Sequence, residues 1–117
     1  MMNLEKLNMS NDKSKLAVVY TAVPGRIAAE RLSFKLLESK LVCCANMING
    51  GSSLFWWEGK IESASEVYCV FKTKPELADR VMEIIEDEHE YDKPLIFCCL
   101  PNKANDSFLE YLSENLG

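Results

Sequence analysis

The spacing of apolar positions divides the chain into seven predicted elements in the order β-α-β-β-α-β-α. Residues 16–22 are nearly all apolar and rich in β-branched side chains, which favours a central strand that ends at Pro24. Residues 25–40 change to helical spacing, and Ile27 and Phe34 lie nearer the charged face, either as a second contact or as an exposed apolar pair. The apolar face of this helix consists of Ala28, Ala29, Leu32, Leu36 and Leu37.

The longest extended stretch is a predicted hairpin with Glu58-Gly59 at its turn. Residues 42–48 and 54–57 form one limb and residues 61–73 form the other, and both limbs are rich in β-branched, aromatic and cysteine residues. A glycine supplies the positive φ that a tight hairpin turn needs. Residues 49–53, with the sequence N-G-G-S-S, form either a loop or a bend in one continuous strand.

This hairpin is too long for the body of a small domain. Each limb, read continuously, holds about 15 residues, or roughly 50 Å of strand, whereas a compact domain of about 100 residues has a radius of gyration of only ~13 Å. The arm must therefore overhang its own core and expose strand edges together with Phe55, Trp56 and Trp57. On a strand the two tryptophans face opposite sides, so one could bind a ligand and the other pack a subunit interface. Interface packing between copies of the chain is the favoured interpretation.

Three further elements complete the predicted chain. Thr73 is expected to cap a helix with Pro75 in its first turn, which runs to residue 87 or 88. Residues 95–100 form a continuous apolar run between two prolines, which predicts a buried strand. Asn105 is expected to cap a last helix. Its buried stripe would consist of Phe108, Leu109, Leu112 and Leu116.

The element order predicts an α+β fold of the ferredoxin-like, split βαβ type with one appended helix. Residues 1–15 are expected to form a flexible polar tail, and residues 16–117 a single domain. The ferredoxin-like fold hosts many unrelated functions, so the fold alone predicts no chemistry.

Composition and charge narrow the classes of partner. The formal net charge is −5 and no run of lysine or arginine occurs, which disfavours nucleic acid and anionic membranes as partners. No segment has the ~18 consecutive apolar residues of a membrane span, and the polar start lacks the apolar region of a secretory signal. The sequence therefore predicts a cytoplasmic protein with five reduced, mostly buried cysteines.

The single histidine, His89, is the candidate metal ligand. It lies among five carboxylates, including Glu88 and Glu90, and imidazole is the commonest protein ligand for metal ions. The alternative is a histidine at a helix end in a solvated acidic loop, since no H-x-x-x-H spacing is present. The cysteines lie in apolar strands without a nucleophile turn or a phosphate-binding loop, so the sequence predicts no enzyme activity.

Several short strings together resemble the CutA divalent-cation tolerance proteins, and the match extends over residues 16–116. The strings are C-A-N at residues 44–46, W-E-G-K-I-E at residues 57–62, Glu66, F-K-T at residues 71–73, and H-E-Y-D-K-P at residues 89–94. The resemblance implies a ferredoxin-like subunit that forms a tight homotrimer through the edges of its extended hairpins. It also implies a link to copper and other divalent cations, and in some eukaryotic members to the anchoring of other proteins.

The resemblance further implies a cleft between subunits around His89. Trp57 and Tyr91 would form its walls, while Lys72 would hold an anion or pair with Glu66. The bacterial copper site uses a cysteine at the end of the first strand and a second histidine, where this chain has Tyr20 and Glu88. These departures favour a weak or harder-ion site of His89 and carboxylates over a copper(I) site. The alternative function is a regulatory or anchoring trimer that binds protein partners or a small anion without a metal.

Overall fold

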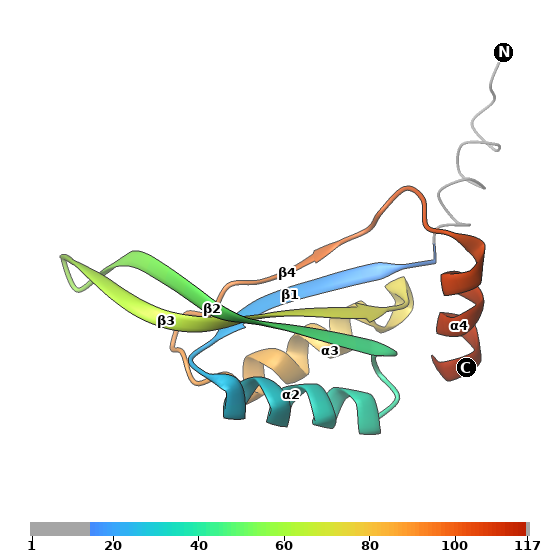
Figure 1. Cartoon of the computed structure of the whole chain (residues 1–117), viewed down its shortest axis with the longest axis horizontal. Coiled ribbons are helices and arrows are strands. Elements are labelled where there is room, and N and C mark those ends of the chain that lie inside the picture. Colours follow the sequence, from blue (N-terminus) through green and yellow to red (C-terminus); the bar gives the residue numbers. More distant parts are fainter. Residues whose placement is uncertain (1–14, 117) are drawn as a thin grey trace, which may run out of the picture.

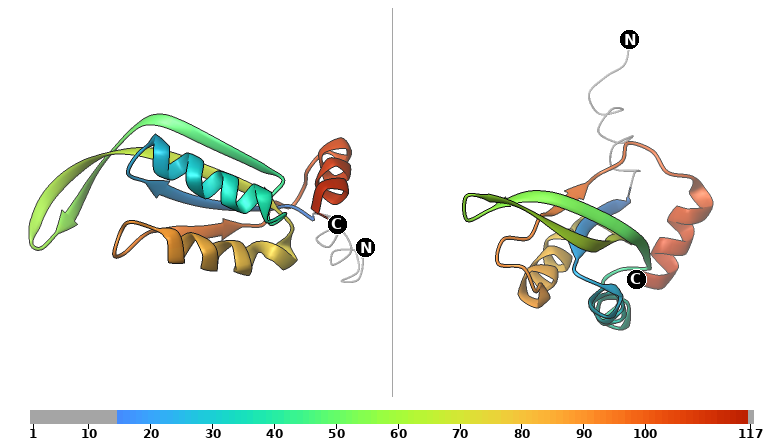
Figure 2. Two further views of the ribbon diagram at one scale, coloured as in Figure 1. Left: turned by 90° about the horizontal axis from the view of Figure 1, so that it is seen from below. Right: turned by 60° about the vertical axis from the view of Figure 1, so that its left-hand side comes forward.

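The computed structural model describes residues 15–116, and these residues form one four-stranded antiparallel sheet with three helices. The elements are β1 (Ala17–Val23), α2 (Arg26–Glu38), β2 (Cys44–Trp57), β3 (Lys60–Thr73), α3 (Pro75–Glu88), β4 (Ile96–Cys99) and α4 (Asp106–Leu116). The strand order is β2-β3-β1-β4, with α2 and α3 together on one face of the sheet (Figures 1 and 2). The predicted ferredoxin-like fold with an appended helix is confirmed.

The core lies between the sheet and these two helices. Side chains of β1 alternate between buried and half-buried positions, as expected for a strand with one face against helices. Val19 and Phe71 on the sheet pack in one cluster with Leu36 of α2 and Ile85 of α3, and all four are fully buried. Most of the predicted tail at residues 1–15 lies outside the described residues. Across the described part of the chain, no helix has the length and hydropathy to cross a bilayer.

The predicted hairpin arm is present and projects well beyond both helices (Figures 1 and 2). Its two strands have 14 residues each, and the molecule measures 54 Å along its longest axis. The radius of gyration is 16.4 Å, above the ~13 Å of a compact domain of this size. At the turn, Glu58 and Gly59 have φ values of 50° and 79°, as a two-residue turn of the type I′ requires.

Residues 49–53 belong to β2 and bend it, so the loop alternative is excluded. The pairing with β3 shifts between Ile48 and Gly51, which marks a β-bulge. Gly50 has a φ of +81°, and a Cβ at Gly51 would lie 2.5 Å from the ring of Tyr68 and 2.9 Å from the Glu66 carbonyl oxygen. Gly50 is therefore required for its positive φ, and Gly51 is required because a side chain would not fit there.

Three local predictions are wrong. Thr73 does not cap α3, because it is the last residue of β3 and its hydroxyl donates a 2.5 Å hydrogen bond to the Leu41 carbonyl. The apolar run at residues 95–100 forms β4 at the open edge of the sheet, where Phe97 is 40% exposed, so within one chain it is not buried. Of the stripe predicted for the last helix, only Leu112 is buried, since α4 lies at the end of the sheet away from the core (Figure 1).

The thiol prediction is only partly met. All five cysteines are free, but only Cys43 and Cys69 are buried, and Cys99 on the edge strand is exposed.

Candidate functional site

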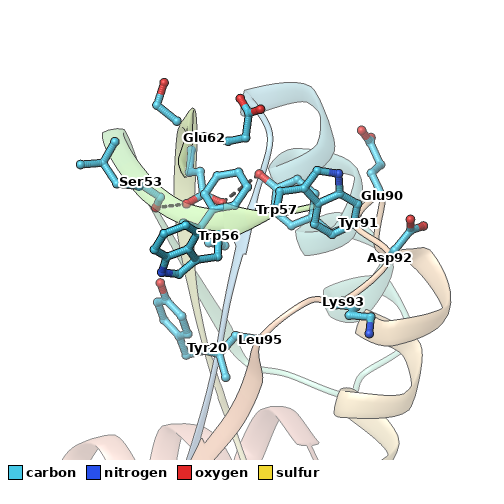
Figure 3. A pocket seen from close by; sticks show the side chains of 15 residues that line it. Tyr20, Ser53, Trp56, Trp57, Glu62, Glu90, Tyr91, Asp92, Lys93 and Leu95 are labelled. Atoms are coloured by element: carbon cyan, nitrogen blue, oxygen red, sulfur yellow. Dashed lines mark hydrogen bonds between the residues drawn. The ribbon is translucent and has the colours of Figure 1, made fainter. Parts of the chain in front are cut away.

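An open pocket of about 850 Å³ lies beside the hairpin arm, between the arm, β1 and the loop after α3. Five aromatic side chains line it: Tyr20, Phe55, Trp56, Trp57 and Tyr91. Four carboxylates line it as well: Glu62, Glu66, Glu90 and Asp92. Figure 3 shows Trp57 with Tyr91 on one side of the pocket and Trp56 above Tyr20 on another. Elements far apart in the sequence therefore build one acidic, aromatic cavity.

Glu66 is the buried charge of this pocket, with only 9% of its surface exposed. Its two carboxylate oxygens accept hydrogen bonds from two different segments: Ser53 Oγ donates to Oε1, and Tyr91 Oη donates to Oε2 at 2.8 Å. Burial, together with the neighbouring Glu66 carboxylate, raises the pKa of Tyr91 to about 12, so the phenol keeps its proton and remains a donor. Glu66 thus joins both strands of the arm to the loop after α3.

His89 follows the end of α3 and is held by both ring nitrogens. Its Nδ1 accepts a 3.2 Å hydrogen bond from the Tyr91 backbone N–H, so in the neutral ring the proton is on Nε2. Nε2 lies 3.0 Å from Thr21 Oγ1 and donates to it, while that hydroxyl donates to the Leu95 carbonyl at 3.0 Å. Burial lowers the pKa of His89, which keeps the imidazole neutral.

The structure brings together only part of the predicted site. Trp57, Glu66 and Tyr91 meet at the pocket, where Phe55 and Trp56 also lie. His89 stands behind Tyr91, with the two ring centroids 5.0 Å apart.

Lys72 lies elsewhere on the sheet. It pairs with Cys44 of β2 in the β-ladder, and its Nζ is 3.9 Å from the Cys44 sulfur, so it does not pair with Glu66 within one chain.

The predicted metal ligands point in different directions. Glu88 pairs with Lys35 of α2, Glu90 lines the pocket, and both nitrogens of His89 are occupied by hydrogen bonds. Within residues 15–116, no group of three or more histidine, cysteine, aspartate or glutamate side chains is arranged to hold a metal ion. Within one chain these residues do not fit a resident metal.

Sequence reasoning missed the polar residues that position this site. Thr21 and Ser53 hold His89 and Glu66, and Glu62 and Asp92 add charge to the pocket. Ser53 lies in the N-G-G-S-S stretch, which signalled a bend. Only the strand register beyond the bulge, with Ser53 opposite Ala64, places its hydroxyl near Glu66.

The family model for the CutA1 divalent ion tolerance protein matches residues 17–115. The chain belongs to this family. A divalent-cation tolerance protein CutA from Pyrococcus horikoshii is 35% identical over 99 residues, which cover 85% of this chain and 96% of the relative. A chloroplastic CutA 1 protein from Oryza sativa subsp. japonica is 35% identical over 98 residues, covering 84% of this chain. The chain spans only 55% of that plant relative's length.

Solved structures of the family have the same fold. The crystal structure of the divalent ion tolerance protein CutA1 from Ehrlichia chaffeensis superposes with a TM-score of 0.85 at 32% identity, covering 88% of this chain and 96% of that one. The CutA1 structure from Oryza sativa gives a TM-score of 0.82 at 34% identity, covering 86% of this chain and 93% of that one. The family resemblance seen in the sequence motifs is therefore confirmed.

Proposed function

We propose that this CutA family member is a non-enzymatic, cytoplasmic homotrimer that acts in divalent-cation tolerance. The hairpin arms join the subunits, and the pocket beside each arm is the ligand-binding cleft. The observation that carries this proposal is the exposed apolar surface of the arm, which projects from the body of the sheet. Leu54 is 78% exposed, Trp56 is 73% exposed and Ile61 is 64% exposed. Surface of this kind, beside open strand edges, normally marks a protein interface.

The two open edges of the sheet support assembly between copies of the chain. β2 and β4 are the outer strands, and Phe97 of β4 is exposed in one chain together with Leu95 and Leu100, which flank this strand. An arm from a second copy would cover this apolar edge, which explains why the sequence of β4 reads as a buried strand. Closure of three such contacts gives the homotrimer that the family resemblance implies, and a closed ring leaves no free edge.

A non-catalytic role is supported by the state of the nucleophiles. Cys69 is fully buried, and burial raises its pKa to about 11, so its thiol is inert at neutral pH. Within residues 15–116 no cysteine is hydrogen-bonded to His89, the base that a thiol nucleophile would need. The acidic character of the protein likewise supports partners other than nucleic acid or membrane.

Light scattering coupled to size-exclusion chromatography tests the assembly. The expected mass is about three times the 13.3 kDa of the chain at micromolar concentration. Trp56→Ser on the arm should shift the mass towards the monomer, whereas Phe34→Ser, at a residue 60% exposed on α2, should leave the trimer intact. A monomeric wild-type protein would refute the proposal.

A second candidate function is metal-independent anchoring of a protein partner. The specific observation in its favour is that His89 already uses both ring nitrogens in hydrogen bonds to its own chain. A copper ion or another divalent cation would therefore have to displace Thr21 or the Tyr91 backbone N–H to bind His89. Such binding would be weak, with Glu90 as the neighbouring carboxylate from the pocket.

Calorimetric titration with Cu²⁺ distinguishes these two candidates. Heat of binding that is lost in His89→Ala would support His89 as a ligand for the ion. Binding unchanged in His89→Ala, or partner capture that persists in this variant with chelator present, would favour the anchoring function. Glu110→Gln is a useful control, because Glu110 lies on α4 and does not line the pocket.

A further inference from the structure

The pocket beside the arm combines aromatic walls with a buried carboxylate. Trp57 and Tyr91 line it from the arm and from the loop after α3, and Tyr20 lines it from β1. Aromatic ring faces attract ammonium groups, with a gain that increases when water is excluded. The same ring faces provide no ligand atoms for a hard metal ion, which requires oxygen ligands. The lining therefore favours an organic cation.

Glu66 supplies an unbalanced negative charge. Only 9% of the Glu66 surface is exposed to solvent, yet its two hydrogen-bond partners, Ser53 and Tyr91, are both neutral. In the described part of the chain Glu66 forms no ion pair, and its carboxylate can accept further hydrogen bonds beyond these two. A buried carboxylate without a counter-charge is unfavourable, so a cation in the adjoining cavity would stabilise the folded protein.

Most of the other charges of the pocket are negative as well. Glu62, Glu90 and Asp92 line it with Glu66, whereas the lining includes one basic residue, Lys93, which Figure 3 shows well apart from Glu62. The carboxylates nevertheless do not converge as metal ligands, since residues 15–116 contain no cluster of three or more such groups. Charges spread over a cavity of about 850 Å³ suit a bulky cation better than a point charge.

We propose that this pocket binds an organic ammonium cation, with its charge against Glu66 and its alkyl groups against Trp57 and Tyr91. The inference rests on the ligand-binding cleft of the proposed function and names the chemical class of its ligand. In the trimer a neighbouring copy would close the open side of the pocket and strengthen both interactions by excluding water.

Intrinsic fluorescence reports on this site directly, because the only two tryptophans of the sequence, Trp56 and Trp57, both line the pocket. The full-length protein is titrated with choline chloride at constant ionic strength. The matched probe is its neutral isostere, in which a tert-butyl group replaces the trimethylammonium group. We expect saturable binding of choline and at least about tenfold weaker binding of the isostere.

Glu66→Gln keeps the shape of the side chain and removes its charge, and should weaken choline binding at least about tenfold. The control is Glu110→Gln on α4, outside the pocket, with affinity expected within about twofold of the wild type. Equal binding of choline and the isostere, or no effect of Glu66→Gln, would overturn the inference. Tighter binding of Mg²⁺ than of choline in the same fluorescence titration would also overturn the inference, since that result would indicate a metal site.

The mass of each sample by light scattering separates the two proposals. If the protein is a trimer that does not bind choline, the ammonium site is refuted and the proposed assembly is retained. If the protein is a monomer, the proposed assembly is refuted. If Glu66→Gln dissociates the trimer while choline has no effect on the wild type, the counter-charge comes from a neighbouring copy, and the ammonium site is refuted.

Discussion

The Tyr91 hydroxyl donates a 2.8 Å hydrogen bond to Glu66 Oε2, which joins the loop after α3 to the long hairpin arm. The two residues are 25 positions apart in the sequence. Their contact fixes one wall of the pocket, because Trp57 and Tyr91 line it from these two segments. The position of the arm relative to the body of the sheet is therefore tied to the loop that also holds His89.

Removing this hydroxyl should destabilise the fold. Tyr91→Phe leaves Oε2 of the buried Glu66 without its donor, and we expect a loss of about 1–3 kcal/mol in the free energy of unfolding. Urea denaturation followed by circular dichroism measures it. The matched control is Tyr111→Phe, whose hydroxyl donates to the Cys43 carbonyl from a residue 44% exposed, where water can replace the lost bond. An equal loss in both variants would contradict the structural role of Tyr91.

The single histidine makes stability dependent on pH in a defined direction. Because burial lowers the pKa of folded His89 below its ordinary value of 6.5, the unfolded state binds the proton more readily. The stabilisation by the neutral ring is complete above pH 6.5 and is lost as the pH falls through the folded pKa. One proton limits this slope to about 1.4 kcal/mol per pH unit.

This pH effect can be measured in two ways. The sequence contains one histidine, so a proton NMR titration gives its folded pKa without an assignment problem. Urea denaturation between pH 8 and about pH 5 should show a steeper loss of stability for the wild type than for His89→Gln. A folded pKa above 6.5, or identical pH profiles, would contradict the hydrogen-bonded neutral imidazole.

The sequence predicted those parts of the fold that depend on local periodicity and turn chemistry. Glu58-Gly59 marked the turn, and the length of both limbs indicated an arm beyond the core. The bulge at residues 48–51 was left open, because two adjacent glycines suit a loop as well as a bent strand, and only the ladder to β3 decides between them. Thr73 matched a capping pattern, but its backbone pairs with Ala17 and its hydroxyl donates to the Leu41 carbonyl.

The site was less predictable because its contacts are long-range. His89 was surrounded by carboxylates in the sequence, but in the fold Glu88 turns to Lys35 and the ring turns to Thr21, 68 positions away. Trp57, Glu66 and Tyr91 were named through the family resemblance. All three line the pocket, whereas Lys72 lies beside Cys44 and outside it.

Chemical protection of Cys69 tests the packing of the sheet against the helices. This thiol is fully buried, and burial raises its pKa to about 11, so both access and thiolate formation are suppressed. Iodoacetamide at neutral pH should leave the Cys69 peptide unlabelled in the folded protein, as measured by mass spectrometry. In urea all five cysteines should react, which provides the control. Labelling of Cys69 at the same rate in both states would show that the core is open.

The last prediction concerns the β-bulge between Ile48 and Gly51, where β2 bends into the arm. A Cβ at Gly51 would approach the Glu66 carbonyl oxygen to 2.9 Å and the Tyr68 ring to 2.5 Å, and a backbone atom cannot move aside as a flexible side chain can. Gly51→Ala should therefore cost about 1–3 kcal/mol in the free energy of unfolding, because the two strands must separate. The matched control is Gly25→Ala, where nothing lies within 4 Å of the added Cβ and φ is extended, with a change expected within about 1 kcal/mol. Gly51→Ala should also displace Glu66, so tryptophan fluorescence from the adjoining pocket should change in the folded variant. Unchanged stability and fluorescence in Gly51→Ala would mean that the bulge is not what sets the approach of β2 to β3.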